Sequence, residues 1–481
     1  MSITRAQPIY FNNAHDYGLA ELFSSTLPVD DGYITVGFGS WPGTLRTVIV
    51  SKCDDNGNEI WNKQFADSIL AMEPRWVLRH EGQTVLSGGH TRSSVTGDYN
   101  HLLFRCNHLG DTLWWRMWGD TAIDEYVMDA RPTHDGNYIL LAAHDYDVAP
   151  LWGQSALIKT DPDGNILWTY EYGESNYYNV PYQVVETRDS GFMIVGYRSD
   201  QFGGNRDLML IKTDSEGNHE WTKYYGGVLD DWGGAIAESM EGGYLAGGYR
   251  ETIDDFEYKG WLLKVDEDGI MEWESFYSHD PWIDNGFWQR LIQLKDGSYV
   301  MLGWAEMNTG RDLGLIAKID CHGNRLWSRT YTRDSTRNHY FYGMDTTSDG
   351  GFIVCGSTFL QGQNQDAWLL KLDEYGCDTP GCHLNDTAMG VPCFTAVPHG
   401  PPTGGESIAI FPNPNDGTFV AQLPGDEVWL VQLLDLSGRL VQQRRLKGSA
   451  TWDVAHLAKG LYLLRATCND GTTATVKVAI E

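Results

Sequence analysis

A unit of about 53 residues recurs seven times along this chain, and this period constrains the fold more than any other feature. Six copies carry a tryptophan, with spacings of 52–54 residues: Trp61, Trp114, Trp168, Trp221, Trp273 and Trp327. A basic residue precedes each tryptophan by nine positions, and a seventh continues the series: Lys52, Arg105, Lys159, Lys212, Lys264, Lys318 and Lys371. Four residues before a glycine or alanine lies a third, mostly aromatic series: Tyr33, Thr84, Tyr138, Phe192, Tyr244, Tyr299 and Phe352. Because the three series stay in register, the chain is a repeat protein.

The fourth copy shows what one unit contains. Short β-type segments cover residues 184–187, 192–196, 207–213 and 220–225, and tight turns rich in Gly, Asp and Asn follow the first and third. Glycine and asparagine supply the positive φ that such turns need. Four antiparallel strands in a unit of this length describe one propeller blade. The sequence therefore predicts an all-β fold whose first domain, residues 8–376, is a seven-bladed β-propeller.

The two ends of this domain predict how the ring closes. The seventh copy reaches residues 371–376 and then lacks its tryptophan-bearing fourth strand, while residues 8–11 precede the first full copy without a partner. Pairing these two halves would complete one blade and remove the open sheet edges. The tryptophans themselves recur in every copy, so we interpret them as packing between blades rather than as a ligand-binding series.

Two further regions follow the propeller. Residues 377–406 are rich in Pro, Gly and Thr and have the composition of a linker. Residues 407–481 contain six short β-type segments separated by turn residues, which predicts a small C-terminal β-sandwich.

This C-terminal region carries four sequence motifs in order. They are Phe411 to Pro414, the segment 434–441, the segment 457–462, and a final strand with a lysine. Together they resemble the type A C-terminal sorting domain of the type IX secretion system in Bacteroidota. The resemblance implies an Ig-like β-sandwich, contact with the type IX secretion machinery, and a protein that is secreted or anchored at the outer-membrane surface. It assigns the sorting motif to Pro412, Asn413, Pro414, Asp435, Gly438, Gly460, Tyr462 and Lys477. The repeats themselves resemble propeller modules that often precede such tails, which implies no defined activity.

Charge and hydrophobicity exclude several classes of partner. The net charge is -30, and residues 407–481 contain seven acidic and seven basic residues, so residues 1–406 carry the whole excess. Such a surface argues against nucleic acid and anionic membranes as partners. The chain has no apolar run of 18 residues, so we predict no transmembrane segment. No signal peptide is visible in residues 1–7, and whether the N-terminus is complete stays open.

Two kinds of sequence feature could bind a metal, the cysteines and the acidic turns. Cys53 and Cys106 occupy the same repeat position and are predicted core thiols. Cys377, Cys382 and Cys393 allow a disulfide in an oxidising compartment, or a weak zinc motif with His383. The turns at residues 161–165 and 266–269 lack the closing glutamate of a calcium loop, so they are interpreted as plain turns. The sequence predicts no cofactor and no metal.

The strand order predicts where a ligand binds. Both tight turns of each blade lie on one face, so the longer connections, which differ between copies, lie on the other, hereafter the variable face. The ligand-face candidates there are aromatic and acidic: Asp124, Tyr126, Tyr178, Asp231, Trp232, Asp284, Trp288 and Tyr340. A structural alternative is that the recurring short polar residues cap loop backbone: Asp16, Asp124, Asn179, Asp231, Asp284 and Asn338.

The sequence contains no catalytic motif of the kinds G-x-S-x-G, H-E-x-x-H or G-x-x-x-x-G-K-[ST], and no catalytic residue is predicted. It therefore does not support an enzyme. The leading hypothesis is a secreted or surface-anchored binding or adhesion protein for a glycan or surface protein. The alternative is a secreted polysaccharide-degrading enzyme, a glycoside hydrolase or lyase, with two carboxylates on the variable face.

Overall fold

The computed structural model describes residues 9–385 and 409–480, with short gaps in both ranges. In the first range the gaps are 19, 41–44, 81–83, 121–122, 146–152, 201–203, 253–257, 278–282, 308–309, 335 and 360–364. In the second they are 412–416, 424–427, 436–438, 458 and 469–472. The regular structure of the described residues is β-strand, apart from a 3-10 helix, η1 (Cys382–Asn385). The chain divides into two compact units, the propeller and a C-terminal sandwich.

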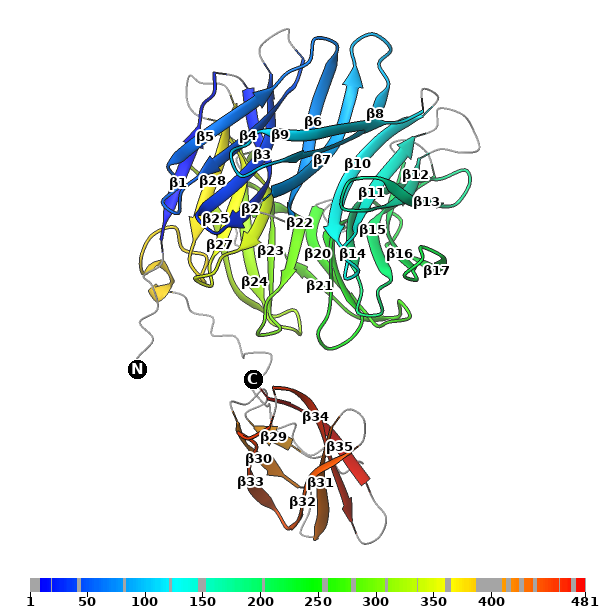
Figure 1. Ribbon diagram of the computed structural model, residues 1–481, viewed down its shortest axis with the longest axis vertical. Coiled ribbons are helices and arrows are strands. Elements are labelled where there is room, and N and C mark those ends of the chain that lie inside the picture. The colour runs from blue at the N-terminus through cyan, green and yellow to red at the C-terminus, as the bar shows by residue number, and fades with distance from the viewer. Residues whose placement is uncertain are drawn as a thin grey trace. The chain divides into compact units, whose positions relative to one another are not determined.

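Seven four-stranded antiparallel sheets form the propeller, as the repeat predicted (Figure 1). Blade 1 contains β2 (Ala20–Val29), β3 (Gly32–Ser40), β4 (Thr47–Cys53) and β5 (Glu59–Phe65). Blade 2 contains β6 (Leu70–His80), β7 (Thr84–Ser93), β8 (Tyr99–Cys106) and β9 (Thr112–Trp118). Blade 3 contains β10 (Asp124–Pro132), β11 (Tyr138–Asp145), β12 (Gln154–Thr160) and β13 (Ile166–Tyr172). Blade 4 contains β14 (Tyr178–Glu186), β15 (Phe192–Ser199), β16 (Arg206–Thr213) and β17 (His219–Tyr225).

The remaining blades continue the same order. Blade 5 contains β18 (Asp231–Glu238), β19 (Tyr244–Glu251), β20 (Tyr258–Val265) and β21 (Met271–Tyr277). Blade 6 contains β22 (Ile283–Gln293), β23 (Tyr299–Met307), β24 (Arg311–Ile319) and β25 (Arg325–Tyr331). Blade 7 contains β26 (His339–Thr346), β27 (Phe352–Phe359) and β28 (Gln365–Leu372), and β1 (Phe11–His15) is its fourth strand.

Strand β1 closes the ring by pairing with β28, so that the blue N-terminal strand lies beside the yellow one in Figure 1. The register runs from Phe11 opposite Lys371 to His15 opposite Ala367. Asn12 adds a side-chain contact, because its Oδ1 accepts a hydrogen bond of 2.8 Å from Trp368 Nε1. Closure by the two half-blades is confirmed, although the strand begins at Phe11 and not at residue 8.

The repeated tryptophans pack between neighbouring blades, as predicted. A Cβ added at Gly110, in the third-to-fourth-strand turn of blade 2, would lie 2.6 Å from the Trp61 ring of blade 1. Gly110 has a φ of +78°, which also favours glycine. In blade 7, which has no such tryptophan, Phe11 takes this place against Gly57 of blade 1. The repeated tryptophans therefore have a structural role, and Phe11 of the closing strand β1 replaces the tryptophan that blade 7 lacks.

The acidic turns are plain turns in the structure. The Oδ1 of Asp161 accepts hydrogen bonds from the backbone N–H groups of Asp163 at 3.0 Å and Asn165 at 2.8 Å. The Oδ1 of Asp266 does the same for Asp268 and Ile270. These carboxylates thus satisfy their own turn backbone.

The cysteines fall into two groups. Cys53 and Cys106 are fully buried, which confirms them as core thiols. Cys377 and Cys382 form a disulfide whose Cα atoms are 5.7 Å apart, while Cys393 lies outside the described residues. The disulfide removes both bonded cysteines as thiolate ligands for zinc.

The C-terminal unit has two sheets. One contains β29 (Ala409–Phe411), β30 (Thr418–Gln422) and β33 (Ser449–Asp453). The other has the order β32 (Leu440–Leu446), β31 (Trp429–Asp435), β34 (Gly460–Cys468) and β35 (Thr473–Ile480). Their buried side chains form one core in which Phe419 stacks on Trp452 at 6.0 Å between ring centroids. The predicted small β-sandwich is thus confirmed.

The structure places four of the eight sorting-motif residues on strands. Gly460 begins β34, Tyr462 follows on the same strand opposite Asp435 at the end of β31, and Lys477 lies on β35 opposite Leu463. Pro412, Asn413, Pro414 and Gly438 lie outside the described residues. Among the described residues, no helix has the length and apolar character needed to cross a bilayer.

Candidate functional site

Each innermost strand of the propeller contains a β-bulge at the same place. The hydrogen-bond register with the second strand shifts by one residue in all seven blades. The extra residues are Ser24, Arg75, Met128, Tyr182, Gly234, Gln289 and Tyr342. A bulge re-aims one side chain out of the regular alternation of a strand. Here all seven bulge residues line one cavity on the propeller axis.

This cavity, hereafter the central pocket, has a volume of about 380 Å³. It lies toward the end at which the chain enters each innermost strand, which is the variable face. Six further residues complete its lining: Leu22, Phe38, Arg46, Glu73, Trp232 and Arg290. Its size falls within the range of small-molecule sites, roughly 300–1,000 Å³.

Glu73 organises the charged side of the central pocket. Its buried carboxylate forms ion pairs with Arg46 and with Arg75 Nη2 at 3.8 Å, and it lies 3.6 Å from His90 Nε2. Burial alone would raise the pKa of Glu73, but the neighbouring His90 ring and the Arg46 guanidinium lower it to about 2. The carboxylate is therefore ionised at neutral pH. The Nε of Arg75 is shielded from solvent and has no hydrogen-bond partner among the described residues.

An aromatic wall lies on the side of blades 4 and 5. Tyr182 meets Trp232 edge to face, with ring centroids 4.7 Å apart, and Trp232 in turn stacks on Tyr249 at 5.5 Å. This packing holds both rings in one orientation, with Tyr182 half-exposed to the cavity. From blade 7, Tyr342 adds a third ring and a hydroxyl 3.4 Å from Ser357 Oγ.

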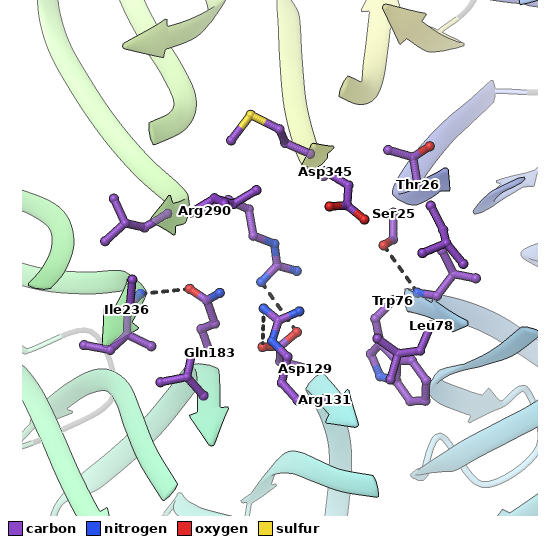
Figure 2. Close-up of a pocket in the computed structure, with 18 of the residues that line it drawn as sticks. Ser25, Thr26, Trp76, Leu78, Asp129, Arg131, Gln183, Ile236, Arg290 and Asp345 are labelled. Carbon is purple, nitrogen blue, oxygen red and sulfur yellow. Dashed lines mark hydrogen bonds and ion pairs between the residues drawn. The ribbon is translucent and has the colours of Figure 1, made fainter. Parts of the chain in front are cut away.

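An ion cluster around the buried Asp129 forms the floor of the central pocket. Asp129 Oδ1 lies 3.6 Å from Arg290 Nη1, and Asp129 Oδ2 lies 3.2 Å from Arg131 Nη2. Figure 2 shows these side chains meeting near the axis, where they line a second cavity of about 420 Å³ toward the tight-turn face. The second cavity also contains Glu186, Glu238 and Asp345. The axis therefore holds a cationic pocket on one side and an acidic one on the other.

The capping interpretation of the recurring polar residues is confirmed wherever their side chains are described. Asp16, Asp124 and Asp231 accept hydrogen bonds from the backbone N–H groups of Gly18, Tyr99 and Gly227. Asn179 donates to the carbonyls of Glu174 and Tyr177, and Asn338 accepts from the N–H of Asp312. Asp284 lies on β22, and its side chain is outside the described residues.

The predicted ligand-face residues are not brought together. Trp232 lines the central pocket, but Trp288 is only 1% exposed and packs in the core between blades 5 and 6. Burial therefore removes Trp288 from the ligand-face candidates. Asp231 is also 1% exposed and pairs with Arg250 Nε at 3.3 Å. The half-buried tyrosines make local contacts: Tyr126 packs on Tyr99 and Tyr340 donates to Asp312 Oδ2, while Tyr178 begins β14.

Sequence reasoning missed the central pocket, although the repeat contains a signal for it. The seven bulge residues recur with the period of the repeat, yet they comprise six residue types: Ser, Arg, Met, Tyr, Gly and Gln. Positions on either side are dominated by small or apolar residues. A position whose residue type varies between the copies does not serve the packing that all copies share. Such a position is therefore a candidate for ligand binding.

Three groups of described side chains have donors suited to a metal ion. Asp373, Cys377 and His383 form one, but Cys377 is in the disulfide. Asp16, Glu21 and Asp366 form another, in which Asp16 is exposed and Glu21 accepts the N–H of Tyr17. The third contains His101, Glu125 and His144. All three are buried, and Glu125 Oε2 accepts the N–H of Asp120 at 3.0 Å.

The comparisons with known proteins address the two units separately. Residues 409–481 match the family described as the secretion system C-terminal sorting domain. No curated protein matches the chain by sequence. The tail directs export through the type IX secretion system to the cell surface or the extracellular space. The predicted sorting function and localisation are thereby confirmed.

Three similar solved structures are remote in sequence. PorZ, an essential surface component of the type IX secretion system of Porphyromonas gingivalis, is 12% identical with a TM-score of 0.44, over 99% of this chain and 61% of PorZ. An ulvan lyase, a polysaccharide lyase, is 10% identical with a TM-score of 0.49, over 80% of this chain and 99% of the lyase. A protein of unknown function from Dyadobacter fermentans is 11% identical with a TM-score of 0.43, over 61% and 93%. This chain thus spans about 61% of the length of PorZ, and similarity at this level carries no argument about its ligand.

Proposed function

We propose that this exported propeller is a binding protein that holds an acidic saccharide in the central pocket. The observation that carries the proposal is the charge of the pocket lining. Three guanidinium groups, those of Arg46, Arg75 and Arg290, line the pocket with one carboxylate, that of Glu73, and Arg290 also pairs with Asp129 in the floor. A chain with a net charge of -30 thus places an excess of positive charge at the centre of its variable face.

Guanidinium groups suit carboxylate or sulfate ligands. Their planar forks bind such anions through two parallel hydrogen bonds, which a lysine ammonium cannot match. Arg46 and Arg75 keep about half of their side-chain surface exposed while touching Glu73, so they can bind a second anion. The exposed part of the Arg75 guanidinium offers donors for it, because the Arg75 side chain is 42% exposed.

The aromatic wall favours a saccharide over a simple anion. The rings of Tyr182, Trp232 and Tyr342 offer apolar surface beside the arginines. A sugar ring presents an apolar C–H face together with its acidic group, so it matches both sides of the pocket. Because the ion cluster of Asp129, Arg131 and Arg290 forms the floor, the pocket suits a chain end or a short oligosaccharide.

The same lining argues for binding rather than hydrolysis. Glycoside hydrolases use a pair of carboxylic acids, one of which must be protonated at working pH. The described lining of the central pocket contains one carboxylate, Glu73, and its pKa of about 2 keeps it ionised. A two-carboxylate mechanism has no support there.

Isothermal titration calorimetry with uronic-acid, sulfated and neutral oligosaccharides of equal length tests the proposal. We expect binding of the acidic ligands, weaker binding at high salt, and a loss of at least about tenfold in Arg75→Ala and in Tyr182→Ala. Arg79→Ala is the matched control, because Arg79 lies on the same strand but on the tight-turn face, paired with Asp30.

Three outcomes would overturn the proposal. One is equal binding of neutral and acidic saccharides, and another is unchanged binding by Arg75→Ala. Release of reducing ends or unsaturated products would make the protein an enzyme instead. Binding of acidic peptides in place of saccharides would keep the pocket and replace the ligand class.

A further inference from the structure

His101, Glu125 and His144 form a buried cluster at the boundary between blades 2 and 3. His101 comes from β8, Glu125 from β10 and His144 from β11. The three residues are 1%, 7% and 5% exposed, and one donor atom from each lies within 4.8 Å of the other two. None of them belongs to the lining of the central pocket.

His144 is oriented by a second carboxylate. Its Nδ1 lies 2.6 Å from Glu171 Oε1, on β13 at the rim of the blade. This contact places the ring proton on Nδ1 and leaves the lone pair on Nε2, which is shielded from solvent and has no hydrogen-bond partner among the described residues. A carboxylate bonded to the far nitrogen of a histidine is the usual support of a metal-binding imidazole.

His101 also has buried ring nitrogens that lack a hydrogen-bond partner among the described residues. Its ring stacks on Trp118 with centroids 5.1 Å apart, and its Nδ1 lies 3.7 Å from Glu125 Oε2, beyond hydrogen-bond distance. Neither ring nitrogen has a hydrogen-bond partner of normal geometry among the described residues, and burial lowers the pKa of His101 although the Trp118 backbone raises it. Leaving such groups buried and unpaired destabilises the folded state.

We propose that His101, Glu125 and His144 bind one zinc ion or a related divalent transition metal, with Glu171 as the support of His144. Two imidazoles and a carboxylate are a ligand set that zinc takes, whereas calcium and magnesium prefer oxygen alone. Donors around a tetrahedral zinc lie about 3.3 Å apart, so small side-chain rotations would close the observed cluster. The ion would join blade 2 to blade 3.

Zinc titration of the full-length protein tests the site. Tag-free protein, stripped of metal with EDTA and dialysed, is titrated with zinc chloride in a calorimeter, and its bound metal is then measured by mass spectrometry. We expect one zinc per chain and a higher unfolding temperature in the zinc-loaded protein. His101→Ala and His144→Ala should lose at least about 100-fold in affinity, and Glu171→Gln about 10–100-fold.

The control variant is His219→Ala, which removes an exposed histidine of blade 4 and should bind zinc like the unmodified chain. Glu171→Gln serves as the deciding variant if the histidine variants do not fold, because the Glu171 side chain is about one-third exposed. Cobalt(II) gives a second readout, since a visible absorption spectrum of tetrahedral type is expected in the unmodified protein. A folded chain that binds no stoichiometric zinc, or zinc affinity unchanged by Glu171→Gln and His144→Ala, would overturn the proposal.

Discussion

At the scale of single residues, burial decides what an acidic side chain in this molecule does. Asp231 and Glu73 are both acidic residues of innermost strands near the variable face. Glu73 meets Arg46, Arg75 and His90 and stays ionised. Asp231 is 1% exposed, and burial raises its pKa to about 6 despite Arg250 and the Gly227 N–H. Glu73 is therefore suited to holding the arginine side chains of the pocket, and Asp231 to holding the loop at Gly227.

The raised pKa of Asp231 predicts an unusual dependence of stability on pH. Between pH 4 and 6 the folded chain holds a proton on Asp231 that the unfolded chain, with an ordinary value near 3.8, releases. This residue therefore adds stability as the pH falls through 6, and the contribution is absent in Asp231→Asn. The free energy of unfolding of the unmodified chain, relative to Asp231→Asn, should rise by about 1–2 kcal/mol from pH 7 to pH 4.5. Urea denaturation of both chains measures this difference, and a constant or falling difference contradicts the prediction.

At the scale of elements, the bulge lets one innermost strand both pack in the core and contribute a side chain to the central pocket. On β26, Phe341 is fully buried and stacks on Trp368 at 4.7 Å between ring centroids, whereas the next residue, Tyr342, is the bulge residue and lines the central pocket. In a regular strand, successive side chains point to opposite faces of the sheet, and both faces of a blade pack on neighbouring blades. The bulge interrupts this alternation and directs one side chain toward the pocket. One extra residue in each of seven strands thus builds a pocket without changing the core.

This pair predicts opposite effects of neighbouring substitutions. Phe341→Ala should lower the free energy of unfolding by about 3–5 kcal/mol, because it leaves a cavity in a closely packed core. Tyr342→Ala should lower it by no more than about 1 kcal/mol, because it removes a side chain with a single long hydrogen bond. It should nevertheless weaken acidic-saccharide binding. Chemical denaturation and calorimetry of the two variants give both quantities; equal losses of stability would contradict the assignment of Tyr342 to the pocket.

The blades could be predicted from residues that recur in each copy, whereas the bulges are marked only by a position that varies between the copies. Turn residues and the packing tryptophans recur because every blade forms the same turns and packs on its neighbour in the same way. The period, the strand order and the ring closure therefore follow from Trp61, Lys52 and their equivalents. A bulge is a shift in hydrogen-bond register and requires no particular residue type. Aromatic residue type alone therefore does not distinguish Trp232, which lines the pocket, from Trp288, whose indole packs between blades 5 and 6.

At the scale of the whole molecule, ligand and destination belong to separate units. The negative charge lies in residues 1–406, and the C-terminal unit is balanced in charge. The propeller is completed by the pairing of β1 with β28, which draws on no residue of the sandwich. The sandwich has a core of its own, built from Phe419, Trp429, Trp452 and their neighbours. A change in one unit should therefore leave the role of the other intact.

Deleting residues 407–481 tests this separation in the cell. The shortened chain keeps every strand of the propeller, so it should fold and bind, but without the sorting domain it should accumulate in the periplasm. Full-length Arg75→Ala should show the reverse, with normal export and weakened binding. Immunoblots of periplasmic, surface and medium fractions measure export, and calorimetry on the purified chains measures binding. Export of the shortened chain at the normal level would refute the assignment of sorting to the tail, and retention of Arg75→Ala would show that the pocket and the sorting step are coupled.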